Sequence, residues 1–357
     1  MIATSKNEWR WIGPLCGLLA AIGYTATNIC LRSVTNIDSA YVAFIRSIPT
    51  LLLVLPLLVV RTAQGESLVA PKTHVFWLVV TGVFTQIFGN VLFQWSLGII
   101  GLALSVPLVF GSMIIGSAVI GAVVLKEPIR KSTSGAIILL LAAVTILTIG
   151  AQNGIGPTKL HPNQMGLVTL AVFGNMISGF AYSALGAVMR RGMKAGMSTE
   201  MTLLLLSLVG LISLGSWSLV RLGPDYMLQL SSGDYGKMLG AGTLNAVSFY
   251  SLATALKRLN VVYVHIINAS QAAMAALAGV LIFSEPLTAY LIFGISLTAI
   301  GLTLPAYSSL FNVGGNNVAA RSGRGHDSKE NDPPHFPKSS ATPVAIPLGD
   351  VLVEESS

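Results

Sequence analysis

The chain has 357 residues, of which 53% are apolar and only 10% are charged. Soluble domains carry about 25% charged residues, so the composition argues against an ordinary soluble enzyme or binding module. The net charge is +7, and the Lys and Arg residues lie in short clusters between apolar blocks. Such clusters are typical of the cytoplasmic loops of membrane proteins and not of a nucleic-acid-binding face. We therefore expect a lipid bilayer as the surroundings and no nucleic-acid partner.

Apolar runs of about twenty residues predict helices that cross a hydrocarbon core of about 30 Å. The sequence contains ten such runs, near residues 12–31, 39–60, 76–97, 102–125, 132–150, 166–189, 199–220, 237–256, 261–283 and 287–307. The first run is interpreted as a span and not as a cleavable signal, because no cleavage site follows it. The predicted fold class is an all-α membrane protein with ten transmembrane helices.

Shifts in composition divide the chain into five parts. Residues 1–11 are a cytoplasmic N-terminus, 12–151 a first set of five spans, 152–163 a polar connector, 164–308 a second set of five spans, and 309–357 a tail. The tail is rich in Gly, Asn, Ser, Pro and charge, so we expect it to be disordered. Cys16 and Cys30 lie about 21 Å apart if their run is helical, which is too far for a disulfide.

The loop charges predict the orientation in the membrane. When the loops are assigned alternately to two sides, sixteen of the 21 Lys and Arg residues fall on one side and four on the other, and Arg46 lies inside a span. Because cytoplasmic loops are enriched in Lys and Arg, both termini should be cytoplasmic. The expected location is the inner (plasma) membrane of the cell, as a multi-pass protein.

The two sets of spans match each other without a gap at an offset of 158 residues. Both place the same residues at equivalent positions: Gly82 and Gly240, Gly121 and Gly279, and Glu127-Pro128 and Glu285-Pro286. Because each half has an odd number of spans, the second half enters the membrane from the opposite side, so the repeat is inverted. Many secondary transporters have inverted repeats and hold their substrate between the halves, which favours transport over another role for the bundle.

Two segments, KEPIRKSTSGAIILLLAAVTIL and SEPLTAYLIFGISLTAIGLTL, end the fourth span of each half in Glu-Pro and continue into a glycine-containing fifth span. In this pattern the chain resembles the EamA-like transporters of the drug/metabolite transporter superfamily, over about residues 12–308. The resemblance implies ten helices, alternating access, and movement of small metabolites such as amino acids or nucleotide-type solutes. Arg46 stands at a position that is often basic in that family, whereas Leu206 stands at the matching place in the second half.

Candidate solute-binding residues are the few polar groups inside the spans, because ionisable groups in hydrocarbon cost about 2.5 to 3.5 kcal/mol each. These residues are Tyr24, Asn28, Arg46, Gln86, Asn90, Asn175, Tyr182, His265 and Asn268. Any one of them alone is better explained as a hydrogen bond between helices. Their recurrence at helical spacing, as in Gln86, Asn90 and Gln94, favours a cavity that binds a polar or zwitterionic solute.

Two of these residues keep an alternative role. Arg46 is the only charge deep within a span, and it either binds an anion or bonds to backbone carbonyls. His265 is the best titratable candidate if protons drive transport, although a neutral core histidine is the favoured explanation. No Asp or Glu lies at mid-depth in any predicted helix, so a carboxylate proton relay is not expected.

The two Glu-Pro pairs, Glu127-Pro128 and Glu285-Pro286, are interpreted as structural corners, because proline prevents simple continuation of a helix. Gating contacts with neighbouring loops are the alternative role for these four residues.

Enzyme motifs are missing from the sequence. It has no Walker loop, paired-histidine metal motif or CxxC, so neither an enzyme nor a cofactor is expected. We predict a secondary transporter that exports a small polar metabolite, an amino acid or a related solute, by alternating access. An uncoupled facilitative exchanger is the first alternative, and a membrane-embedded lipid-modifying enzyme is a less favoured one. Formation of a homodimer is left open.

Overall fold

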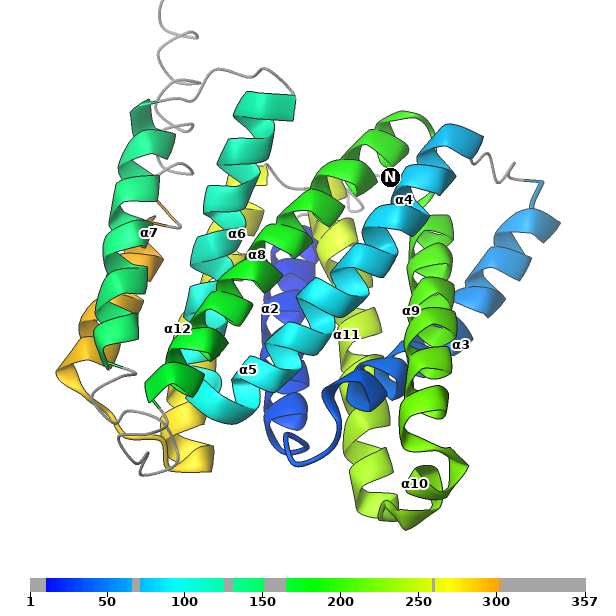
Figure 1. Ribbon diagram of the computed structural model, residues 1–357. Coiled ribbons are helices and arrows are strands. Elements are labelled where there is room, and N and C mark those ends of the chain that lie inside the picture. Colours follow the sequence, from blue (N-terminus) through cyan, green and yellow to red (C-terminus); the bar gives the residue numbers. More distant parts are fainter. Residues whose placement is uncertain are drawn as a thin grey trace, which may run out of the picture. The chain divides into compact units, whose positions relative to one another are not determined.

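Helices make up the computed structural model of the chain, which describes residues 11–65, 71–124, 131–150, 165–258, 261–301 and 303. No strand occurs in these ranges. The helices, most of which are labelled in Figure 1, are α2 (Ile12–Arg32), α3 (Ser39–Ala63), α4 (Lys72–Phe84), η1 (Thr85–Val91), α5 (Leu92–Ile100), α6 (Leu102–Val124), α7 (Lys131–Gly150), α8 (Met165–Lys194), α9 (Thr199–Leu222), α10 (Pro224–Gln229), α11 (Ser232–Arg258), α12 (Val261–Phe283) and a last helix, Ala289–Gly301. The described residues all belong to one compact unit, Met1–Asn312.

Helices lie in the described part of every run that the sequence predicts to cross the membrane. Six have the length and apolar composition of a span: Ile12–Arg32, Ser39–Ala63, Lys72–Ile100, Leu102–Val123, Met165–Lys194 and Thr199–Leu222. The all-helical membrane class is confirmed for the described residues, and the count of ten spans stays a prediction. The expected connector 152–163 and tail 309–357 lie outside the described residues, as do Glu127 and Pro128.

Large apolar side chains cover the outer faces of these helices. Val220 is 88% exposed, Leu281 is 77% exposed and Val123 is 72% exposed, and all three belong to apolar helices. Exposed apolar area of this kind is unfavourable in water and is acceptable in hydrocarbon. These faces are therefore the ones that contact lipid.

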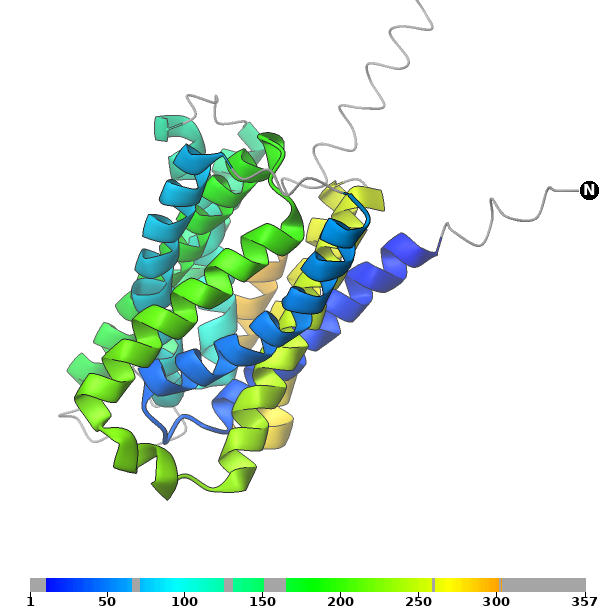
Figure 2. The same cartoon turned by 90° about the vertical axis from the view of Figure 1, so that its right-hand side faces the viewer.

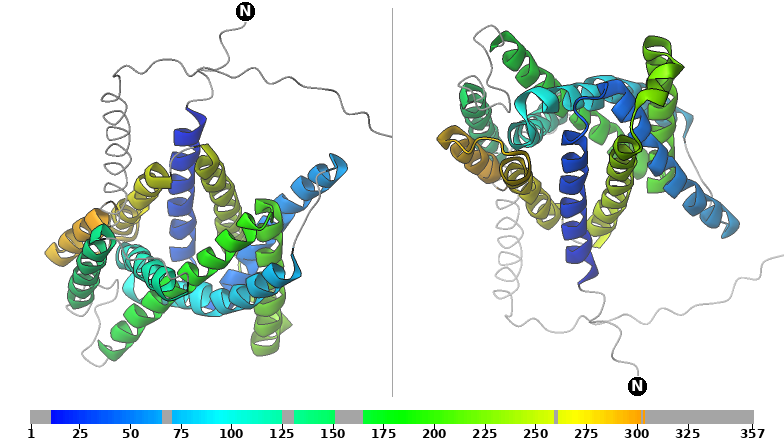
Figure 3. Two further views of the ribbon diagram at one scale, coloured as in Figure 1. Left: turned by 90° about the horizontal axis from the view of Figure 1, so that it is seen from above. Right: turned by 90° about the horizontal axis from the view of Figure 1, so that it is seen from below.

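Small residues allow α2 to pack between α11 and α12 (Figure 3). A Cβ added to Gly23 would collide with Ser248 of α11, and one added to Gly17 would lie 3.2 Å from Ile267 of α12. Glycine lets helix backbones approach closely in membranes, where packing drives association. The first helix of the chain is thereby held by two helices from its second half.

One buried apolar cluster joins the two halves of the chain. It includes Leu31, Tyr41, Val42, Leu97, Leu102, Val106, Met238, Ala241 and Ala275, which come from α2, α3, α5, α6, α11 and α12. The second helices of the halves, α3 and α9, also pack along each other. The halves therefore share one core and are not two separate bundles.

The helix directions define two ends of the bundle. At the Arg32 end, α2 and α9 finish, α3 begins, and α10 leads from α9 into α11 (Figure 2). At the Arg61 end, α3 finishes and α9 begins. These names are used for the two ends below.

Candidate functional site

Asp38 fixes the start of α3. Its carboxylate accepts hydrogen bonds from the backbone N–H groups of Ala40 and Tyr41, at 3.0 and 3.1 Å. These are donors that the first turn of a helix leaves without partners. Arg46 is half-buried and lies about 12 Å along the helix axis from this cap, at 1.5 Å per residue. Its charge is therefore well inside the apolar part of the span.

The backbone of α11 approaches α3 closely at Arg46. A Cβ added to Gly242 would collide with the carbonyl oxygen of Arg46 and would lie 2.9 Å from Cγ of Pro49. Pro49 lacks an N–H, so it interrupts the hydrogen-bond pattern inside α3 at the same level. The two halves of the chain therefore touch beside this arginine.

A π-helical segment interrupts the third span. α4 continues into η1 and then into α5 without a break. Such segments are rare and frequently occur at functional sites. This one carries Gln86 and Asn90, and its wider turn separates them from Gln94. The side-chain nitrogen of Gln94 instead donates to the carbonyl of Leu31 at 3.0 Å, which is a bond between helices.

Four side chains form a hydrogen-bonded group, named here the polar cluster: Arg46, Gln86, Asn90 and Tyr182. Asn90 lies at its centre, and its Oδ1 accepts from Nη2 of Arg46 and, at 2.7 Å, from the hydroxyl of Tyr182. Its Nδ2 donates to Oε1 of Gln86 at 2.6 Å. Gln86 in turn donates to the carbonyl of Leu206 at 3.4 Å. The cluster therefore joins α3 and η1 of the first half to α8 and α9 of the second.

Two glycines leave room for the polar cluster. A Cβ added to Gly210 of α9 would lie 2.6 Å from Nε2 of Gln86. One added to Gly89 of η1 would lie 3.2 Å from Cε1 of Tyr182. A larger residue at Gly210 would displace the Gln86 amide, so glycine at this position is required for the contact between the halves.

Arg46 has no carboxylate partner among the residues that the structure describes. The acidic residues in that part of the chain are Asp38, Glu200, Asp225, Asp234 and Glu285. Four of them pair with other cations, and Asp225 is exposed on α10. Because a charge in hydrocarbon is costly, the polar cluster presents a cation whose charge the described chain does not balance.

The other predicted binding residues lie apart from the polar cluster or outside the described structure. Asn175 is fully buried, and its Nδ2 donates to the carbonyl of Ser105 at 3.0 Å, which makes it a bond between α8 and α6. Tyr24 and Asn28 are half-buried on α2, and neither side chain bonds to another described residue. His265 and Asn268 belong to α12, but their side chains lie outside the described part. The structure thus brings together four of the nine predicted residues.

Glu285 joins three helices at the Arg32 end. Its Oε1 lies 3.0 Å from Nε of Arg32, the last residue of α2. The same oxygen accepts from the backbone N–H of Leu102 at 2.8 Å, and Oε2 accepts from that of Ala103 at 2.8 Å, so the carboxylate caps α6. The residue is only 4% exposed. Sequence reasoning named Glu285 but missed Arg32.

The Glu-Pro pair lies at the corner where α12 ends. Ser284 adopts a left-handed conformation with φ of +54°, and the N–H of Glu285 donates to the carbonyl of Gly279 at 3.0 Å. Many helices end in this way, with a left-handed residue just after the last turn and a backbone bond that reaches back into the helix. Pro286 then prevents the helix from continuing. The corner aims the Glu285 carboxylate at the start of α6.

Two ion pairs between α3 and α9 were missed by sequence reasoning. Asp38, at the start of α3, contacts Arg221 in the last turn of α9. At the other end, Nη2 of Arg61 in the last turn of α3 lies 3.1 Å from Oε1 of Glu200 in the first turn of α9. The hydroxyl of Tyr250 donates to the same oxygen at 2.8 Å. An acidic residue at the start and an arginine at the end of each half's second span is the signal that predicts both pairs.

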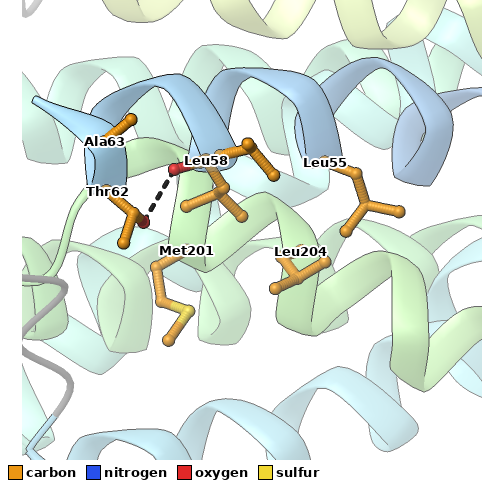
Figure 4. Close-up of a pocket in the computed structure, with 7 residues that line it drawn as sticks. Leu55, Leu58, Thr62, Ala63, Met201 and Leu204 are labelled. Atoms are coloured by element: carbon orange, nitrogen blue, oxygen red, sulfur yellow. Dashed lines mark hydrogen bonds between the residues drawn. The ribbon is translucent and has the colours of Figure 1, made fainter.

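A hollow of about 430 Å³ lies between the end of α3 and the start of α9 (Figure 4). Its lining residues are nearly all apolar: Leu55, Leu58, Val59, Thr62, Ala63, Met201 and Leu204. The one hydroxyl among them, on Thr62, already donates to the carbonyl of Leu58 at 2.8 Å. This hollow therefore offers no free polar group to a solute, unlike the polar cluster.

The fold and the polar cluster define a class of protein, a helical membrane protein whose two halves meet at polar groups inside the apolar bundle. The sequence pattern of the EamA-like transporter family matches residues 11–149 and, a second time, residues 169–306. The chain therefore belongs to the EamA-like transporter family, within the drug/metabolite transporter superfamily, and has its two-repeat membrane fold. This confirms the resemblance inferred from the Glu-Pro segments.

A solved crystal structure of a protein is similar to the chain, with a TM-score of 0.57 and 13% sequence identity. The similarity covers 83% of this chain and 96% of that chain. At this identity the likeness concerns the fold alone. No curated protein matches the sequence.

Proposed function

We propose that this protein is a secondary transporter that exports a small polar metabolite, an amino acid or a related solute, by alternating access. One observation carries the proposal: the polar cluster lies inside an apolar bundle and is built by both halves. Tyr182 and the Leu206 carbonyl come from the second half, and Arg46, Gln86 and Asn90 come from the first. A site of this kind can open to either side when the halves move against each other.

Antiparallel contacts support an inverted repeat of ten helices, with halves at residues 12–151 and 164–308. Glu285 follows the fourth helix of the second half and binds the start of α6, the fourth helix of the first half. Asp38 precedes α3 and contacts Arg221 at the end of its counterpart α9. Equivalent helices that run in opposite directions are the result expected from a twofold axis in the membrane plane.

The Arg32 end has the contacts expected of a closed gate. The ring of Tyr41 lies 5.6 Å from that of Tyr226 and 6.4 Å from that of Tyr235, and its hydroxyl lies 2.7 Å from the Tyr235 hydroxyl. These rings join α3 to α10 and α11, and therefore join the two halves. Opening the polar cluster to this side requires these rings to separate, together with the Arg32–Glu285 pair at the same end.

Flux through proteoliposomes tests the proposed function. We expect the full chain to move one chemical class from a mixed panel of labelled amino acids, nucleosides and amines. The polar cluster has few side chains, and their fixed arrangement matches the polar groups of only one class. Accumulation driven by a pH gradient would indicate proton coupling and would make His265 the next residue to replace. Equilibration that is indifferent to pH would indicate the uncoupled exchanger. Empty liposomes are the control, and folded protein that moves no member of the panel would contradict the proposal.

We also propose that the protein lies in the inner (plasma) membrane with both termini in the cytoplasm, because most loop cations fall on that side. The Arg32 end then faces outward. Reporters fused after Met1 and after Ser357 should both give the cytoplasmic signal. An external signal from one fusion alone would show an odd number of spans and would remove the support for two five-helix halves, and an external signal from both would reverse the proposed orientation.

A further inference from the structure

Arg46 uses only part of its hydrogen-bonding capacity within the described chain. A guanidinium carries five N–H donors in a planar fork and stays charged at every pH of interest. Among the described residues, Nη2 of Arg46 donates to Oδ1 of Asn90, and the guanidinium also interacts with the hydroxyl of Tyr182. No described backbone carbonyl accepts a bond from this side chain, which argues against a purely structural arginine. These two contacts do not use all five donors, so the remaining part of the fork is available to a ligand.

The neighbours of Arg46 orient its guanidinium but do not neutralise it. Asn90 and Gln86 carry neutral amides, and Gln86 is anchored by its bond to the carbonyl of Leu206. Oδ1 of Asn90 already accepts from both Arg46 and Tyr182. The described acidic residues all lie near the two ends of the bundle, at Asp38, Glu200, Asp225, Asp234 and Glu285. A balancing negative charge at this depth must come from outside the described chain.

We infer that the solute carries an oxyanion, either a carboxylate or a phosphate, that binds to the free part of the Arg46 fork. The inference rests on the proposed function and names the chemical class of the solute for the same cluster. A guanidinium matches two oxygens of either group through parallel N–H···O bonds, and such charge-assisted bonds are about twice as strong as neutral ones. A neutral or purely cationic solute would leave Arg46 unbalanced during transport. Gln86 and Asn90 are positioning residues in this arrangement.

Thermal unfolding of the purified full chain measures anion binding without requiring flux. Acetate or inorganic phosphate should raise the Tm by about 2 °C or more over acetamide at equal ionic strength, and the two anions distinguish a carboxylate site from a phosphate site. Arg46→Gln should abolish this rise. Arg46→Lys, which keeps the charge but loses the fork, should retain part of it and guards against misfolding of the glutamine variant.

Lys237→Gln is the matched control for the charge change, because it removes one cation from an exposed pair with Asp234. It should leave the rise in Tm unchanged. An equal Tm in acetamide and in both anions, or a rise that persists in Arg46→Gln, would overturn the anion site.

Matched solutes separate this inference from the proposed function. An amino acid should cross proteoliposomes at least about tenfold faster than its amide, or a sugar phosphate faster than the sugar, and Arg46→Gln should remove the difference. Flux with no preference for the anionic member would keep the transporter and overturn the anion site. Stabilisation by anions with no flux of any solute would keep the anion site and overturn the transporter.

Discussion

Replacing Glu285 by glutamine is expected to lower the free energy of unfolding by about 3 kcal/mol, because removal of one partner of a buried ion pair leaves the charge of the other partner buried and uncompensated. The Arg32 side chain is only 10% exposed and would lose its carboxylate partner. The amide keeps one acceptor oxygen, so one of the two bonds to Leu102 and Ala103 would also be lost. Denaturant or thermal unfolding of the purified protein measures the change.

Asp225→Asn is the matched control, since it removes a carboxylate that is exposed on α10. Its effect should stay within about 0.5 kcal/mol. Cys30 supplies a second readout because it packs against the buried cluster at the Arg32 end. With Cys16 replaced by alanine, alkylation of Cys30 should be faster in Glu285→Gln than in the Asp225→Asn control. Unchanged stability and unchanged labelling would contradict the role of Glu285 in joining the halves.

Glu285 shows which part of the fold follows from the sequence. Apolar runs predict the helices because hydrocarbon accepts only long apolar segments with their backbone bonds satisfied. The repeated Glu-Pro predicts the corner after α12. The partner Arg32, however, is 253 residues away along the chain, and no local pattern identifies it. Such pairing depends on which helices pack together, and therefore on the fold itself.

The polar cluster shows the same division. Arg46, Asn90 and Tyr182 could be predicted as candidates because polar groups are rare and costly inside spans. The four-residue spacing also grouped Gln94 with Asn90, but that spacing assumes a regular α-helix. The π-helical turn changes the direction of the following side chains, so Gln94 bonds to α2 instead. No sequence pattern that we used detects a π-helical turn.

The two ion pairs between α3 and α9 are expected to control opposite ends of the transporter. Arg221→Gln removes the Asp38 pair at the Arg32 end and leaves the bonds with which Asp38 caps α3. Arg61→Gln removes the Glu200 pair at the other end, where the Tyr250 hydroxyl keeps its bond to Glu200. Each change should therefore favour opening at one end without unfolding a helix. In alternating access the two substitutions shift the conformational equilibrium in opposite directions.

The native cysteines measure this difference, because Cys16 lies near the start of α2 and Cys30 near its end, at the Arg61 and Arg32 ends respectively. Glu200 is 1% exposed, so Arg61→Gln should accelerate alkylation of Cys16 about tenfold, which corresponds to about 1.4 kcal/mol. Arg221 is 50% exposed, so its pair is weaker and Arg221→Gln should accelerate alkylation of Cys30 about threefold.

Single-cysteine backgrounds separate the two rates, and Lys237→Gln controls for the loss of one exposed cation. Rigid halves that rock about the polar cluster must close one end when they open the other. Arg61→Gln should therefore slow the alkylation of Cys30 while it accelerates that of Cys16, and Arg221→Gln should do the reverse. Faster labelling of both cysteines in either variant would indicate general loosening of the bundle and would contradict alternating access between the repeats.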